Sequence, residues 1–201
     1  VKQKLDDFKV HLPLMHAMLN PGMRERHWRK VAEKVGRSVQ PNEMSTLLSL
    51  LEQQVGDHLE VLQEMSETAS KEYSLEKALD RMLNEWKPIA FDCTAYRDSG
   101  TFILRGLDEI QSLFDDHIVK TQAMRGSPFI KPFEKRVRDW EEKLMSMQET
   151  LDEWLKCQSV WLYLEPIFSS EDIMRQMPTE AKRFKQVDGL WRKTMAATSD
   201  R

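Results

Sequence analysis

The stretch "FEKRVRDWEEKLMSMQETLDEWLKCQSVW", residues 133–161, decides the fold class of this chain. Its seam positions alternate steps of four and three residues without a slip: Phe133, Val137, Trp140, Leu144, Met147, Leu151, Trp154, Gln158 and Trp161. Residues at such steps share one face of an α-helix. The pattern predicts one long helix over about residues 131–164, in which the seam extends about 40 Å and carries force along its axis. Two alternatives are a bundle helix that only buries its seam and a dimer formed through that seam.

The next stretch, "WLYLEPIFSSEDIMRQMPTEAKRF" at residues 161–184, predicts a corner between helices. Pro166 lacks the N–H that would bond the Leu162 carbonyl, so the long helix is expected to end there. Ser169 followed by Asp172 is similar to a capping box, and Pro178 fits the first turn of a further helix. The candidate flexible junction residues at this corner are Pro166, Ser169, Ser170 and Pro178.

Upstream of the long helix, residues 1–87 have the spacing of several helices. Gly36 is placed to stop one helix in a left-handed conformation, and Asn42 is the expected N-cap of the next. That helix is expected to continue, with breaks near Gly56, to about Lys71. A further amphipathic helix is expected from Ser74 until just before Pro88.

The period changes to two between residues 88 and 105. Ile89, Phe91, Cys93 and Ala95 alternate with other residues, as do Phe102 and Leu104 after the turn sequence Asp98-Ser99-Gly100. This alternation predicts one β-hairpin with a buried face, a wet face and a wet tip at residues 96–100. Because two strands alone are marginal in water, the hairpin is expected to pack on helices.

Helical spacing returns over residues 106–201 and is interrupted once before the long helix, at the sequence Arg125-Gly126-Ser127-Pro128. Arg125, Gly126 and Ser127 are therefore further candidate flexible junctions. The whole pattern predicts a mainly α protein, an elongated multi-helix bundle or arch with one small β-hairpin insertion. Its expected parts are helical residues 1–87, the hairpin at 88–105 and helical residues 106–201.

Composition excludes some classes of partner. The chain has 201 residues, 40% hydrophobic and 31% charged, and a formal net charge of -3, with Lys and Arg spread among Asp and Glu. We therefore expect no nucleic-acid partner. No apolar run approaches the roughly 18 to 20 residues that span a bilayer, so no membrane partner is expected. Two cysteines favour a reducing compartment with free thiols, and a disulfide between them stays open. The opening Val-Lys-Gln-Lys is interpreted as the start of a fragment of a longer polypeptide.

No motif for catalysis, a cofactor or a metal stands out. The sequence has no glycine-rich phosphate loop, and its five histidines form no metal-binding motif. Residues 115–117, Asp-Asp-His, are the one tempting metal cluster, but neighbours on a helix point about 100° apart, so an exposed acidic face is the favoured interpretation. Cys93, on a strand face, and Cys157, in the long helix, are expected to be inert packing thiols. Catalytic, cofactor-binding and metal-binding residues are therefore all predicted as none.

Three stretches resemble the linker region of dynein heavy chains, N-terminal region 2, and nearly cover the chain in order. They are "LPLMHAMLNPGMRERHWRKVAEKVG" (12–36), "YRDSGTFILRGLDEIQSLFDDHIVKTQAMRGSPFIKPFEKRVRDWEEKL" (96–144) and "LDEWLKCQSVWLYLEPIFSSEDIMRQMPTEAKRFKQVDGLWRKTM" (151–195). The sequences of these stretches are more similar to axonemal than to cytoplasmic heavy chains. The expected location is the cytoskeleton, in the axoneme of a cilium or flagellum, with the cytoplasm as the alternative.

The resemblance implies a non-catalytic mechanical lever of a microtubule motor. It would couple changes in the ATPase ring of the same heavy chain to the tail and cargo, with the ATP sites outside this chain. Microtubules and other dynein subunits would be indirect partners. The alternatives are a passive helical scaffold or interaction module in an axonemal assembly, and an enzyme with a dispersed site.

Breaks and exposure, rather than the resemblance, supply the candidate sites of such a lever. The hairpin tip, Tyr96, Arg97, Asp98 and Ser99, is a candidate surface for docking on the ring. The helix breaks named above are the candidate bending points.

Overall fold

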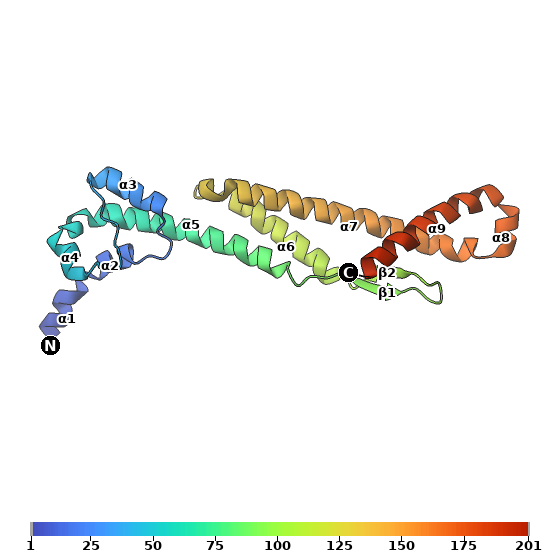
Figure 1. Cartoon of the computed structure of the whole chain (residues 1–201), viewed down its shortest axis with the longest axis horizontal. Helices are drawn as coiled ribbons and strands as arrows, with labels where there is room; N and C mark the ends of the chain where they lie inside the picture. The colour runs from blue at the N-terminus through green and yellow to red at the C-terminus, as the bar shows by residue number, and fades with distance from the viewer. Residues whose placement is uncertain (1, 201) are drawn as a thin grey trace. The chain divides into compact units, whose positions relative to one another are not determined.

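The computed structural model describes residues 2–200, and helices make up most of it (Figure 1). In chain order the elements are α1 Lys2–Lys9, α2 Leu12–Met18, α3 Glu25–Val35, α4 Leu47–Glu52, the 3-10 turn η1 Val55–His58, α5 Leu59–Glu85, β1 Asp92–Ala95, β2 Phe102–Arg105, α6 Asp108–Arg125, the 3-10 turn η2 Lys131–Phe133, α7 Glu134–Phe168, α8 Glu171–Gln176 and α9 Pro178–Ser199. The prediction of a mainly α fold with one small β-hairpin is confirmed.

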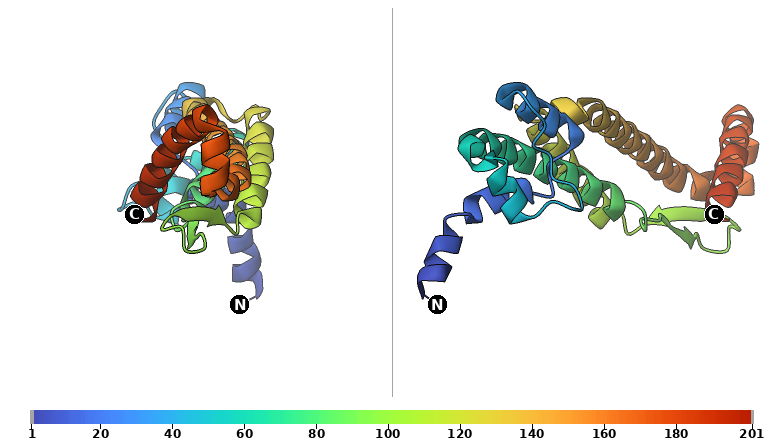
Figure 2. Two further views of the ribbon diagram at one scale, coloured as in Figure 1. Left: turned by 90° about the vertical axis from the view of Figure 1, so that its right-hand side faces the viewer. Right: turned by 60° about the vertical axis from the view of Figure 1, so that its left-hand side comes forward.

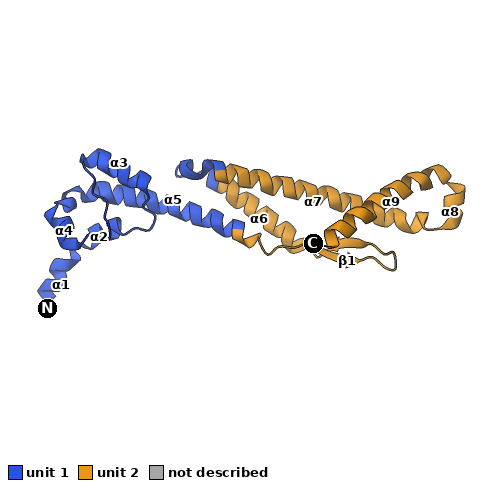
Figure 3. Cartoon of the chain, in the orientation of Figure 1, with its two compact units in different colours: residues 1–83, 124–135 blue, residues 84–123, 136–201 orange. Residues whose placement is uncertain are grey.

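Contacts divide the chain into two compact units, drawn in separate colours in Figure 3. Unit 1 comprises residues 1–83 and 124–135, and unit 2 comprises residues 84–123 and 136–201. Within residues 2–200, no helix combines the length and the apolar character that crossing a membrane requires.

Unit 1 is built around the first part of α5. Buried side chains of α2, α3, η1, α5 and the loop after α3 form its core: Leu14, Ala17, Met18, Trp28, Val31, Val39, Val55, Leu62 and Met65. Gly36 ends α3 in the left-handed conformation, with φ of 83°, as predicted. The N-cap of α4 is Thr46, whose hydroxyl accepts a bond from the Ser49 amide, so the expected cap at Asn42 is wrong. Asn42 instead closes its own turn by accepting a bond from the Met44 amide.

The predicted break between Lys71 and Ser74 is absent, because α5 is one continuous helix from Leu59 to Glu85. The buried positions Leu62, Met65, Ala69, Glu72 and Leu79 keep a helical spacing through the expected break. Glu72 is a charged residue in this buried series. Its carboxylate is paired with Arg26 and His27 of α3, so it can be buried without interrupting the helix.

Unit 2 contains the hairpin, most of α6 and α7, and all of α8 and α9. β1 and β2 pair antiparallel, with Cys93 opposite Leu104 and Thr94 opposite Ile103. The strands are shorter than predicted, since β1 begins at Asp92 and Ile89 and Phe91 are exposed before it. Figures 1 and 2 show α8 and α9 turning back from the end of α7, with α9 beside the hairpin, and α9 contacts both strands.

The predicted long helix forms as α7, and burial confirms its seam. Val137, Trp140, Leu144, Leu151 and Trp161 are all buried. The helix runs to Phe168, so the prediction that Pro166 ends it is wrong by two residues. Pro166 lies in the last turn and is exposed, so water can reach the carbonyl that its ring leaves without a donor.

Candidate functional site

The candidate site is a junction in unit 2 where the hairpin meets α7 and α9. We call it the hairpin anchor, and it consists of Tyr96, Ser99, Leu104, Gln158, Trp161, Asp188, Trp191 and Arg192. All of its contacts lie within unit 2.

Gln158 fastens β2 to α7 through both ends of its side-chain amide. Its Oε1 accepts a bond from the Leu104 amide at 2.8 Å, and its Nε2 donates to the Leu104 carbonyl at 3.0 Å. Both backbone groups of Leu104 therefore face the edge of β2 away from β1. A third strand would bond these groups in a larger sheet, so Gln158 satisfies an otherwise open edge. Gln158 is only 8% exposed, which keeps water from competing for the two bonds.

Three aromatic rings join the hairpin to both helices. Trp161 of α7 meets Tyr96 edge-on with ring centroids 5.3 Å apart, and it stacks on Trp191 of α9 at the same centroid distance with 19° between the planes. The Trp161 indole N–H donates to Asp188 Oδ1 at 3.0 Å, which satisfies the polar atom of this buried ring. These contacts fix one face of α9 on the end of the seam.

Arg192 completes the anchor by reaching from α9 to the hairpin tip. Its Nε donates to Asp188 Oδ2 at 2.8 Å, and its Nη1 donates to the carbonyl of Ser99. The same Asp188 thus orients both Trp161 and Arg192. A side chain held at two points in this way loses its freedom to leave the tip.

The tip is less exposed than the predicted wet loop at Tyr96 and Ser99. Tyr96 is only 7% exposed because its ring packs on Trp161, so its expected exposure is wrong. Arg97 and Asp98 are exposed, and Ser99 is half-buried. Arg97 has a φ of 48°, and its guanidinium lies 5.0 Å from the centroid of the Tyr96 ring. The accessible side chains of the candidate docking surface are therefore those of Arg97 and Asp98.

The corner after α7 is held by local contacts. The Ser169 hydroxyl donates to the Glu165 carbonyl at 2.7 Å, so Ser169 closes α7, and the predicted cap at Ser169 for the next helix is wrong. Ser170 is the N-cap of α8 but makes no side-chain cap bond, whereas Pro178 opens α9 as expected. Phe168 stacks on Phe184 across the corner, with ring centroids 5.2 Å apart.

The other predicted junction lies in unit 1, directly after α6 ends at Arg125. Two backbone bonds close successive turns there: the Ser127 amide donates to the Met124 carbonyl at 3.1 Å, and the Ile130 amide donates to the Ser127 carbonyl at 3.2 Å. Gly126 lies between the first pair. The helix break predicted at Arg125, Gly126 and Ser127 is thus present, and its role as a hinge stays a prediction.

His117, from the Asp-Asp-His stretch at residues 115–117, is buried and engaged in structural bonds. His117 accepts a bond from the Trp86 indole N–H at Nδ1, 2.9 Å away, and its Nε2 lies 2.9 Å from Glu85 Oε2. Both ring nitrogens of this buried histidine are therefore used to join the end of α5 to α6 within unit 2. Among residues 2–200 no group of three or more His, Cys, Asp or Glu is arranged to hold a metal ion.

The two thiols are free and differ in their surroundings. Burial and, next, the charge of Asp92 raise the pKa of the Cys93 thiol, so it stays protonated at neutral pH. Cys157 is exposed, so its predicted packing role is wrong: it lies beside the seam, one position before Gln158, and not on it.

A second polar centre lies in unit 1 between α3 and α5. His27 is buried, its Nδ1 accepts a bond from the Arg24 amide, and its Nε2 lies 2.9 Å from Glu72 Oε2. Arg26 also donates to Glu72, through Nε at 2.9 Å. Burial lowers the pKa of His27 below 6.5, against the opposing effect of the Glu72 hydrogen bond and charge, and Arg26 and Lys30 add to the lowering. His27 is therefore neutral at physiological pH.

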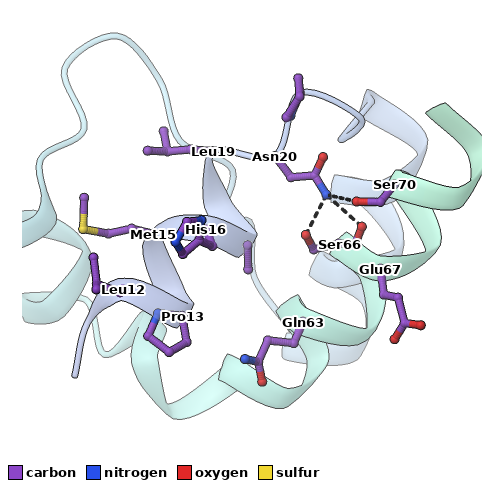
Figure 4. A pocket seen from close by; sticks show the side chains of 12 residues that line it. Leu12, Pro13, Met15, His16, Leu19, Asn20, Gln63, Ser66, Glu67 and Ser70 are labelled. Carbon is purple, nitrogen blue, oxygen red and sulfur yellow. Dashed lines mark hydrogen bonds between the residues drawn. The ribbon is translucent and has the colours of Figure 1, made fainter. Parts of the chain in front are cut away.

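Unit 1 also has a groove of about 670 Å³ between α2 and α5, shown in Figure 4. Asn20 forms one end of it, donating to the Ser66 carbonyl, the Ser66 hydroxyl and the Ser70 hydroxyl at 2.7–2.8 Å. The Asn20 side chain also accepts a bond from the Gly22 amide. Asn20 thus ties the turn after α2 to α5.

The sequence reasoning placed Gln158 on the seam but missed its function. The available signal was one amide among otherwise apolar and aromatic seam positions, because a polar group buried there must find a partner. Asp188 and Arg192 carried no comparable signal. Their roles depend on the return of α9 to the hairpin, which spacing along the chain does not reveal.

The fold and this site define the class of protein: a mainly helical protein in which the hairpin anchor holds a β-hairpin against two helices. The model of the family "Dynein heavy chain, N-terminal region 2" matches residues 1–201. The chain therefore belongs to the dynein heavy chain family, within N-terminal region 2.

Curated relatives are axonemal members of that family. The chain is 52% identical to human dynein axonemal heavy chain 3 over 98% of its own length, and 47% identical to mouse dynein axonemal heavy chain 1 over 97%. It is 53% identical to human dynein axonemal heavy chain 12 over 86% of its length. The matched region is 5%, 5% and 6% of these three relatives, respectively, so the chain corresponds to a small part of each.

Proposed function

We propose that this region is a mechanical lever element of a microtubule motor. It couples ATP-driven changes in the ATPase ring of the heavy chain to movement of the tail and cargo. The region itself catalyses no reaction. The ATP sites lie elsewhere in the heavy chain. The ring is the direct partner, and microtubules and other dynein subunits are indirect ones. The axonemal relatives indicate that the protein is located in the cytoskeleton, in the axoneme of a cilium or flagellum.

The hairpin anchor is the observation that carries this proposal. A lever transmits displacement only if its parts keep their arrangement under load, and buried, directional contacts supply that resistance. Within unit 2 the anchor joins a hairpin, the long helix α7 and the returning helix α9 through a paired amide, stacked indoles and a bridging Arg–Asp pair. The exposed tip residues Arg97 and Asp98 project from this fastened part, which suits them to contact the ring.

Gln158→Ala in a complete dynein heavy chain tests the proposal. The substitution leaves the buried N–H and C=O of Leu104 without partners, which costs about 1–3 kcal/mol locally while α7 stays helical. We expect ATP-driven microtubule gliding to slow while ATP turnover persists, because the chemistry is intact and its coupling to movement is weakened. Gliding velocity and ATPase rate are measured on the same preparation.

Gln186→Ala is the matched control, since Gln186 is an exposed glutamine of α9 in the same unit. It is expected to leave both rates unchanged. A passive scaffold makes a different prediction, namely that Gln158→Ala leaves gliding velocity intact at normal expression and helicity. That result would reject the lever in favour of the scaffold.

A further inference from the structure

A short segment between α6 and α7 belongs to a different compact unit from most of the two helices that it joins. Residues 126–133, which we call the strap, lie in unit 1, whereas residues 84–123 and 136–201 lie in unit 2 (Figure 3). Local backbone bonds shape the strap, among them the bond from the Phe133 amide to the Ile130 carbonyl at 2.8 Å. Side chains attach it to the rest of unit 1.

Two cations of unit 1 lie over aromatic rings of the strap. The Arg26 guanidinium of α3 lies 5.5 Å from the centroid of the buried Phe133 ring. Lys71 Nζ of α5 lies 5.0 Å from the centroid of the half-buried Phe129 ring. A cation over a ring face is attracted by the quadrupole of the ring, more strongly where water is excluded. The two contacts therefore join the strap to two different helices.

Carboxylates of α5 hold both cations in place. Glu72 Oε2 accepts a bond from Arg26 Nε at 2.9 Å and another from Arg26 Nη2, and it lies 2.9 Å from His27 Nε2. Glu72 is only 6% exposed, so water screens its charge weakly. Glu67, which is exposed, accepts a bond from Lys71 at 2.7 Å. Glu72 is thus a positioning residue that acts on the strap through Arg26.

We propose that the strap is a releasable catch: it docks on α3 and α5 through Arg26, which Glu72 positions, and through Lys71, and it opens while both helices stay folded. Local structure favours such release. The strap begins with a glycine and ends in the 3-10 turn η2, whose hydrogen-bond geometry is poorer than that of an α-helix. A segment held by few contacts opens at a lower free energy than the unit to which it belongs. The inference is independent of the lever role, because all of these contacts lie within unit 1.

Amide hydrogen exchange in the complete heavy chain tests the catch, with peptides of the strap, α3 and α5 followed by mass spectrometry. In the wild type, the strap is expected to exchange faster than α5, because it opens locally. Glu72→Gln keeps the size of the side chain but removes its charge. It is expected to speed exchange of the strap about tenfold, within the range of about two- to thirtyfold for losing one cation–π contact. Unchanged exchange of the strap would overturn the proposal.

Glu64→Gln is the matched control, because Glu64 of α5 also bonds a cation of α3, Lys34, at 2.7 Å. That pair is exposed, and its loss is expected to leave the strap at the wild-type rate. The proposal fails if Glu64→Gln accelerates the strap as much as Glu72→Gln does. It also fails if α3 and α5 accelerate in step with the strap in Glu72→Gln, because the strap then does not open by itself.

Lys71→Met tests the second contact at an exposed position, where the substitution removes no core packing. Exchange of the strap is expected to rise about threefold. Lys77→Met is its control, because Lys77 is also an exposed lysine of α5 over an aromatic ring, with Nζ 5.3 Å from the centroid of Tyr73 on its own helix. Equal exchange of the strap in these two variants would overturn the docking through Lys71.

Double-mutant cycles distinguish positioning from a merely structural role. Arg26→Met and Phe133→Leu are each expected to speed exchange of the strap. If Arg26 acts through the Phe133 ring, Arg26→Met adds no acceleration in a Phe133→Leu background. Glu72→Gln is likewise expected to add none in an Arg26→Met background. Independent effects that multiply in either cycle would overturn the assigned roles.

Discussion

At the scale of single residues, some positions allow a close backbone contact only because the residue there lacks a Cβ atom. Gly22 is such a position, because the turn after α2 approaches the backbone of α5. A Cβ added at Gly22 would lie 2.5 Å from the Ala69 carbonyl oxygen and 3.0 Å from Tyr73 Cβ. The obstacle is a helix backbone, which cannot move aside as a flexible side chain can.

Gly22→Ala is therefore expected to lower the free energy of unfolding by about 3 kcal/mol, since either the turn or α5 must shift. Denaturant unfolding measured by circular dichroism checks this. Gly56→Ala is the control, because a Cβ at Gly56 meets nothing within 4 Å, and its effect is expected to stay within about 0.5 kcal/mol. Equal stabilities of the two variants would contradict the close approach.

His27 makes the stability of unit 1 depend on pH. Burial lowers its folded-state pKa below 6.5, so below pH 6.5 the unfolded chain binds the proton more readily than the folded one. The contribution of neutral His27 is fully present above pH 6.5 and is lost as pH falls toward the lowered pKa. The loss is at most about 1.4 kcal/mol per pH unit.

His27→Gln is expected to destabilise the protein more at pH 7.5 than at pH 5.5, because only the wild type loses this contribution on acidification. Urea unfolding at both pH values measures the difference. His16→Gln, at an exposed histidine, serves as the control for losing one imidazole. A stability difference for His27→Gln that is the same at both pH values would show that His27 is not the acid-sensitive group.

At the scale of elements, α9 combines a fastened face with a weak interior position. Trp191 and Met195 are buried on the fastened face, while Gly189 lies exposed in the helix interior. Glycine there costs conformational entropy and contributes no packing.

Gly189→Ala is expected to raise the free energy of unfolding by about 0.5–1 kcal/mol, because the added Cβ meets nothing within 4 Å and alanine favours helix. Thermal unfolding measures the gain. Gly36→Ala is a contrasting variant, because its φ of 83° strains any side chain, and it is expected to destabilise instead. A loss of stability in Gly189→Ala would mean that α9 bends or packs at that glycine.

At the scale of the whole molecule, the exposed hairpin tip is the candidate contact with the ring. Replacing Arg97 and Asp98 together with Ala in a complete motor is expected to slow ATP-coupled gliding without unfolding the region. Neither side chain is part of the core. Arg97 already has a positive φ of 48°, so alanine at this position adopts a backbone conformation that a residue with a Cβ occupies in the wild type. Gliding velocity is the measurement.

The matched control replaces Arg105 and Asp108, an exposed pair of the same residue types near the other end of the hairpin. It is expected to leave velocity at the wild-type value. If the tip variant glides as fast as the control, the docking role of Arg97 and Asp98 is rejected while the hairpin anchor is unaffected.

How far the sequence could predict each feature depended on the range of the interaction involved. The seam of α7, the stop at Gly36 and the start at Pro178 were predictable because periodicity and capping act over a few residues. The expected end at Pro166 and the break after Lys71 were wrong, because a final turn tolerates proline and a buried Glu72 is compensated from α3. The bonds of Gln158 and Arg192 join residues more than fifty positions apart, which local rules cannot identify.

The sequence by itself determined the helical class, the hairpin and the family, because these follow from spacing, turn residues and similarity to relatives. Only the tertiary structure decided that Tyr96 is buried, that Cys157 is exposed, and that Gln158 and Asp188 fasten the hairpin to α7 and α9. The physical reason is that burial and hydrogen-bond partners are properties of neighbours in space, and in the hairpin anchor those neighbours come from distant parts of the chain.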